Sequence, residues 1–122
     1  MTKSELLKRT KKIALDILLF VNNLPKIQSA NIISNQLIRA ATSIGANYRA
    51  SLRGKSKADF IYKIRLVEEE FDEALYWLEL LNESHIRCPE QINLLLDEAN
   101  QLTAIFTQIA KTSKMKIIIH NS

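Results

Sequence analysis

The chain has 122 residues, a length that forms one compact domain. Hydrophobic residues make up 47% and charged residues 25%, with only 2 Gly and 2 Pro, which excludes collagen-like, low-complexity and intrinsically disordered chains. The net charge of +4 is unevenly distributed: residues 1–65 carry 13 Lys/Arg and 3 Asp/Glu, whereas residues 66–110 carry 1 and 10. This asymmetry predicts either a basic surface for an anionic partner or two halves of complementary charge that meet.

The cellular compartment follows from what the sequence lacks. Its single cysteine, Cys88, cannot form an internal disulfide. The first twelve residues do not resemble a signal peptide, and no apolar stretch approaches the roughly 20 residues of a membrane span. We therefore expect a cytoplasmic protein with no membrane association.

The first predicted helix covers about residues 3–24 and the second about residues 30–53. Thr2 and Glu5 have the spacing of a capping box before the first helix, and Pro25 prevents its continuation. The centre of the second helix is rich in small side chains, which let a neighbouring helix approach closely. We expect Gly45, within that centre, to be a packing feature and not a helix end.

The third predicted helix begins after Gly54, with Ser56 and Asp59 in a second capping pattern, and continues to about Ser84. Its apolar residues alternate spacings of four and three, as in helices packed nearly antiparallel. That seam contains Phe60, Ile64, Val67, Phe71, Ala74, Leu78 and Leu81. The fourth helix is expected to start at Pro89 and to end near Lys111.

Short connections between long helices favour antiparallel neighbours, so the predicted fold is all-α: an antiparallel up-down-up-down four-helix bundle. The bundle would cover residues 1–113. The C-terminal tail, residues 114–122, either packs on a partner subunit or is flexible. A turn near Gly54 places Arg39 opposite Glu70, which predicts a structural ion pair between the second and third helices.

Three stretches of the second and third helices carry a family resemblance. They are Arg-Ala-Ala-Thr-Ser-Ile-Gly-Ala-Asn at 39–47, Lys-Ser-Lys-Ala-Asp-Phe-Ile at 55–61 and Tyr-Trp-Leu-Glu-Leu-Leu at 76–81. With them, the chain resembles the bacterial four helix bundle protein family, also called the 23S rRNA intervening-sequence proteins. Where many members have Asn-Ile-x-Glu-Gly, this chain has Asn-Tyr-Arg-Ala-Ser at 47–51, which is similar to a basic subset.

The resemblance implies an antiparallel four-helix bundle that assembles into a homo-oligomeric ring, a pentamer. It also implies a relation to an accessory protein of diversity-generating retroelements, which associates with nucleic acid and a reverse transcriptase. The family has no catalytic residues or cofactors to carry over to this chain.

The residues give no independent sign of catalysis. His85 and His120 lack the Glu-x-x-His spacing of di-iron bundles, and the acids between Glu68 and Glu73 spread around their helix. Cys88 has His85 nearby but no third member of a catalytic triad. We therefore expect no metal site, no cofactor and no enzymatic activity.

Basic residues form two clusters. The first helix carries Lys3, Lys8, Arg9, Lys11 and Lys12. The turn between the second and third helices is surrounded by Arg49, Arg53, Lys55, Lys57, Lys63 and Arg65, with Tyr48 and Tyr62 interleaved. Cations flanked by aromatic rings suit a phosphate backbone and occasional base stacking. These six cations are the predicted nucleic-acid site, with the four from Arg49 to Lys57 as its principal contact.

The alternative interpretation is a solvated or intersubunit basic face that pairs with the acidic half of the chain. Four apolar residues outside the helix seams, Ile61, Leu75, Trp77 and Leu80, favour assembly because one bundle cannot bury them all. We predict a non-enzymatic oligomer that binds RNA or DNA, or scaffolds a ribonucleoprotein or reverse-transcriptase complex. The alternative is a protein–protein scaffold without nucleic-acid affinity.

Overall fold

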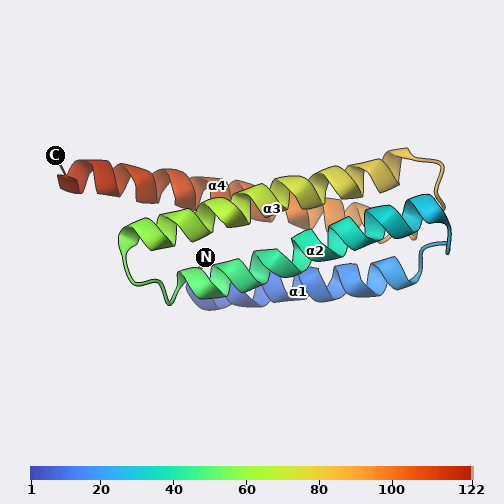
Figure 1. The fold of residues 1–122 in the computed structure, drawn as a ribbon, viewed down its shortest axis with the longest axis horizontal. Coiled ribbons are helices and arrows are strands. Elements are labelled where there is room, and N and C mark those ends of the chain that lie inside the picture. Colours follow the sequence, from blue (N-terminus) through green and yellow to red (C-terminus); the bar gives the residue numbers. More distant parts are fainter. Residues whose placement is uncertain (122) are drawn as a thin grey trace.

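The computed structural model describes the backbone of residues 1–121 and the side chains of residues 1–113. Four helices follow one another: α1 (Lys3–Asn22), α2 (Gln28–Ser51), α3 (Lys57–Glu83) and α4 (Ile92–Asn121). Figure 1 shows them as an antiparallel up-down-up-down bundle, so the predicted all-α fold is confirmed. Within the described residues α1 packs on α2 and α4 but not on α3, so α1 and α3 occupy opposite corners.

Both predicted helix caps are present. Thr2 Oγ1 accepts a hydrogen bond from the Glu5 backbone N–H at 3.1 Å, and the Thr2 N–H donates to Glu5 Oε2 at 3.0 Å. At α3, Ser56 Oγ accepts from the Asp59 N–H at 3.1 Å. By contrast, α2 begins two residues before its predicted start. Its N-cap, Ile27, makes no side-chain hydrogen bond, so the sequence gives no capping signal at the true start.

Helix α4 differs from its prediction at both ends. Pro89 to Gln91 form a turn. The Pro89 carbonyl accepts from the Ile92 N–H and the Glu90 carbonyl from the Asn93 N–H, both at 3.1 Å, and the helix proper starts at Ile92. Its backbone continues to Asn121, beyond the expected end near Lys111. The side chains of residues 114–122 lie outside the described part, so the packing of this tail stays a prediction.

The core lies along the bundle axis, where Phe20, Phe71 and Phe106 are fully buried. The predicted seam of α3 is buried throughout except for Phe60, which is half-buried. Leu75 is also buried, so its expected position outside the core is wrong. Because α3 packs on both α2 and α4, its buried face is wider than the seam of a two-helix contact.

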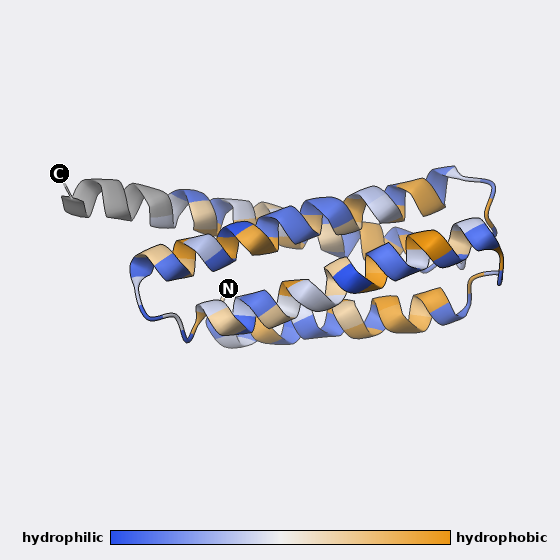
Figure 2. Cartoon of the chain, viewed as in Figure 1, coloured by the Kyte–Doolittle hydropathy of each residue, from blue (hydrophilic) through white to orange (hydrophobic). Residues whose placement is uncertain are grey.

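The solvent-exposed apolar residues are mostly ones that the sequence pattern did not single out. Leu15, Leu19 and Leu94 are 52%, 62% and 73% exposed. Figure 2 shows hydrophobic segments concentrated in the half of α1 next to the α1–α2 connection. In the described part of the chain, no helix is both long and apolar enough to cross a membrane.

Candidate nucleic-acid interface

The turn between α2 and α3 holds three exposed cations that have no acidic partner among the described side chains. After Ser51 the chain turns through Gly54, where an added Cβ would lie 2.7 Å from Asp59 Oδ2. The carboxylate of Asp59 accepts from Lys63 Nζ at 3.2 Å and is thereby occupied. Within the described residues, no ion pair involves the exposed side chains of the turn, which are Arg53, Lys55 and Lys57.

Arg49 lies in a different place from these three cations, in a groove of about 410 Å³ between α1 and α2. Lys8 and Lys11 of α1 line the same groove. The two basic clusters of the sequence therefore meet at one end of the bundle, because the antiparallel α1 starts where α2 ends (Figure 1). The sequence-based prediction placed the binding site at the turn alone. An antiparallel register between α1 and α2, of the kind that pairs Arg39 with Glu70, would have brought the two clusters together.

The remaining basic residues of α1 include two that are paired within the chain. Arg9 Nε donates to Glu98 Oε2 at 3.0 Å, and this hydrogen bond raises the pKa of the arginine above its ordinary value. Lys12 Nζ lies 2.6 Å from Asp16 Oδ2, which raises the pKa of the lysine in the same way. These two cations already have anionic partners and are not free to bind phosphate.

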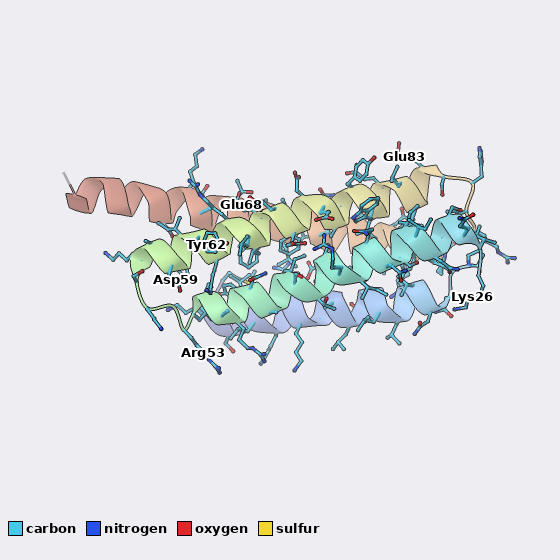
Figure 3. The ribbon with its side chains drawn as sticks, viewed as in Figure 1. Lys26, Arg53, Asp59, Tyr62, Glu68 and Glu83 are labelled. Carbon is cyan, nitrogen blue, oxygen red and sulfur yellow. The ribbon has the colours of Figure 1, made fainter. Side chains whose placement is uncertain are left out.

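Two members of the predicted six-residue site lie apart from the others. Lys63 points back to Asp59, as described above. Arg65 lines a groove on the α4 side of α3, together with Glu68, Glu69 and Asp72. The predicted site is thus divided among three surroundings: the exposed turn, the α1–α2 groove and the acidic α3–α4 groove. Figure 3 shows Arg53 and Asp59 at the turn, with Tyr62 on the first part of α3.

The two tyrosines predicted to flank the cations have opposite environments. Tyr48 is 2% exposed, and its ring meets Phe106 edge-on with the centroids 5.0 Å apart. Burial raises the pKa of the Tyr48 phenol. The expectation that Tyr48 stacks on bases is therefore wrong, because its ring belongs to the core. Tyr62 is 60% exposed and remains available for stacking.

The similarity of this chain to known proteins covers nearly its whole length. The family model described as 23S rRNA-intervening sequence protein matches residues 2–108. This chain belongs to the 23S rRNA-intervening sequence protein family. A crystal structure at 1.70 Å of a protein of unknown function, from the S23 ribosomal protein family of Bacteroides thetaiotaomicron VPI-5482, has a TM-score of 0.81 and 30% sequence identity to it. The match covers 91% of this chain and 99% of that one. No curated protein matches the chain.

The residues that carry the family resemblance in α2 have structural roles in this member. Arg39 Nη1 lies 3.5 Å from Glu70 Oε1, as the antiparallel register predicts, and Arg39 Nη2 lies 2.5 Å from Glu73 Oε1. The hydrogen bond from Arg39 lowers the pKa of Glu73. Asn47 Nδ2 donates to the Ser43 carbonyl at 3.0 Å. Through Arg39 the motif therefore joins α2 to α3, and the guanidinium is occupied by two carboxylates, whereas Asn47 bonds within its own helix.

The groups that could carry catalysis do not form a reactive site in the described residues. Among the described residues, no three His, Cys, Asp or Glu side chains lie together in a way that could hold a metal ion. The half-buried Cys88 donates to the Leu81 carbonyl at 3.5 Å, and burial raises the pKa of its thiol. A raised thiol pKa disfavours the nucleophilic thiolate at neutral pH.

Proposed function

We propose that this chain is a non-enzymatic, homo-oligomeric bundle that binds nucleic acid through the exposed cations of the α2–α3 turn. The observation that carries the proposal is the lack of any acidic partner at Arg53, Lys55 and Lys57 in the described structure. Free ammonium and guanidinium groups neutralise phosphates and release counterions without first breaking an internal ion pair. We leave Arg49 out of this set because it lines the α1–α2 groove.

The ligand class that best fits this turn is single-stranded or looped RNA. Lysine and arginine contacts to phosphates carry no base information, so binding is expected to depend little on sequence. Tyr62 adds an exposed aromatic ring on which an unpaired base can stack. The family resemblance supports a scaffold role in a ribonucleoprotein or reverse-transcriptase complex as the wider setting.

Homo-oligomerisation is supported by exposed apolar side chains. Leu15, Leu19 and Leu94 are each more than half exposed in the single chain, and burial against another subunit would remove their apolar surface from water. The resemblance to ring-forming relatives favours a pentamer. Light scattering at micromolar concentration should give a multiple of the 14.0 kDa chain mass, and a mass of one chain would overturn this part of the proposal.

A salt titration of RNA binding tests the nucleic-acid proposal. Arg53→Ser with Lys55→Ser removes one arginine and one lysine from the turn, and Lys26→Ser with Arg87→Ser removes the same pair of residue types from the opposite end. For a single strand, each lost phosphate contact should reduce the log–log salt slope by about 0.7, so the turn variant should lose about 1.4. The control variant should keep the wild-type slope.

The same titration distinguishes the alternative function. If the wild-type oligomer binds neither RNA nor single-stranded DNA at low salt, the protein–protein scaffold without nucleic-acid affinity becomes the better account. If both variants lose the same slope, binding follows net charge and the turn is not the contact surface.

A further inference from the structure

The groove between α1 and α2 has the form of a helix-binding site. Its floor contains Ala14, Gly45 and Ala46, residues small enough to allow the axis of another helix to approach closely. Its rim carries Lys8, Lys11 and Arg49, all exposed and without an ion pair in the described residues. The groove therefore offers an apolar floor and three positive charges to an occupant.

A matching surface exists on α3 of the same sequence. One row along its solvent side, which follows the exposed Arg65, has alternating spacings of three and four and only exposed members: Glu69, Asp72, Tyr76, Glu79 and Glu83. None of these four acids forms an ion pair within the described residues. Tyr76, in the middle of the row, is 54% exposed. The core does not require this row, because the buried face of α3 lies on its other side.

We propose that the α1–α2 groove of one copy receives the acidic row of α3 from a second copy of this chain. Lys8, Lys11 and Arg49 then face carboxylates, and the ring of Tyr76 covers the small-residue floor. An acidic amphipathic helix that lies in a cationic groove buries the apolar floor and also pairs the rim cations with carboxylates. This inference rests on the proposed homo-oligomer and names one pair of contact surfaces in it. The exposed Leu15, Leu19 and Leu94 lie outside this pair.

The placement of the two surfaces determines the kind of assembly. Because α1 and α3 occupy opposite corners of the bundle, the groove and the acidic row of one copy face different neighbours. Such a contact is heterologous, and repeating it produces a closed ring or an open filament rather than a two-fold dimer. The turn cations Arg53, Lys55 and Lys57 take no part in it and remain free at the end of every subunit.

The apolar floor favours a protein occupant over a nucleic acid in this groove. Phosphates pair with the rim but leave the floor in contact with water, whereas a helix with an aromatic side chain covers it. The chain also supplies the complementary charge itself, since its net charge is −9 over residues 66–110.

Charge reversal tests the proposed contact. Lys8→Glu with Lys11→Glu makes the groove acidic, and Glu69→Lys with Asp72→Lys makes the row basic. Each variant should raise the dissociation constant of the oligomer at least about a hundredfold, because like charges then face each other. The chain that carries all four changes should assemble again. Lys26→Glu with Arg87→Glu is the control and should keep the wild-type mass in light scattering.

Each outcome decides the inference. If the wild type is multimeric and neither reversal changes its mass, the interface lies elsewhere, while the homo-oligomer proposal stands. If the groove variant keeps its mass but loses RNA binding, the groove binds nucleic acid and the inference is wrong. A wild-type mass of one chain overturns both this contact and the homo-oligomer, and leaves the nucleic-acid proposal to its own salt titration. If the single reversals dissociate the oligomer and the fourfold variant does not restore it, the inference also fails, provided that circular dichroism shows all variants folded.

Ala46→Trp, at an exposed position in the groove, should dissociate the oligomer without changing its charge.

Discussion

On the side of α2 that faces α3, charge is satisfied within the chain: Arg39 contacts both Glu70 and Glu73. On the side that faces α1, Arg49 shares a groove with Lys8 and Lys11, and within the described residues none of the three has an acidic partner. The two sides belong to one helix, and each carries an arginine. What separates them is the neighbouring helix, since α3 is acidic in its middle and α1 is basic near its start.

This difference shows why a count of basic residues is a poor guide to a binding surface. Of the cations at the turn end, Arg9, Lys12 and Lys63 are paired with carboxylates, whereas those of the turn and the groove have no such partner within the described residues. Surface ion pairs contribute little to stability, but they do remove a cation from the set available to an anionic partner. The free cations are the ones on which a function can depend.

The largest expected effect distinguishes the two tyrosines at the turn end. Tyr48→Ala should lower the free energy of unfolding by about 3–5 kcal/mol, because it removes a buried ring packed on Phe106. Tyr62→Ala should change it by no more than about 0.5 kcal/mol, because Tyr62 is exposed. Urea unfolding at equal protein concentration measures both. Equal losses would mean that Tyr62 also belongs to the core.

The two glycines provide the next comparison, one on the open side of α2 and one at the turn. Gly45→Ala should raise the free energy of unfolding by about 0.5–1 kcal/mol, because its Cβ would lie 3.6 Å from the Thr10 carbonyl oxygen, an ordinary contact, and alanine favours a helix. Gly54→Ala should lower it by about 1 kcal/mol, because its Cβ would lie 3.2 Å from the Ser51 carbonyl oxygen and collide with Asp59.

Thermal unfolding of the two alanine variants checks these signs. Destabilisation by Gly45→Ala would show that α1 and α2 pack too tightly there for a methyl group, and that the groove floor is closed. Stabilisation by Gly54→Ala would show that the Asp59 carboxylate can turn away from the turn without cost.

The smallest effect concerns the closed side of α2 and its dependence on pH. The hydrogen bond from Arg39 lowers the pKa of Glu73 below the ordinary value of 4.5. As the pH falls, Glu73 therefore binds a proton in the unfolded chain before it does so in the folded one. This contribution to stability is present above about pH 4.5 and is lost as the pH falls through the folded pKa.

The variant Arg39→Gln should consequently be slightly less stable than the wild type at pH 7, and the difference should shrink towards pH 3. Exchange of both partners, Arg39→Glu with Glu70→Arg, should recover part of the stability that either single change loses. A difference that is constant with pH would show that Arg39 contributes through packing alone.

Much of the fold could be predicted from the sequence, because it depends on local signals. The capping residues Thr2 and Ser56 located two helix starts, and the register about Gly54 located the contact of Arg39 with Glu70. The start of α2 was missed because Ile27 provides no capping side chain. Leu75 was misplaced because a helix with two packed neighbours buries more than one seam.

The candidate site was less predictable, because it depends on which side chains meet across helices. Helix spacing from Ile44 places Asn47 or Tyr48 on the apolar stripe of α2, but nothing local shows that the Tyr48 ring lies against Phe106, 58 positions further along the chain. Likewise, Arg49 and Lys8 are 41 positions apart and meet only when α1 and α2 are antiparallel. The pairing of Lys63 with Asp59 follows i,i+4 helix spacing and could have been read from the sequence.

The most direct test compares a free cation with a paired one at the same end of the bundle. Lys55→Ser and Lys63→Ser each remove one positive charge, but Lys63 is bound to Asp59 whereas Lys55 has no acidic partner in the described structure. The measurement is the salt dependence of single-stranded RNA affinity for the two variants and the wild type. Our account predicts that Lys55→Ser lowers the log–log slope by about 0.7 while Lys63→Ser leaves it unchanged. Equal reductions in slope would contradict it, because binding would then follow net charge and not the free cations of the turn.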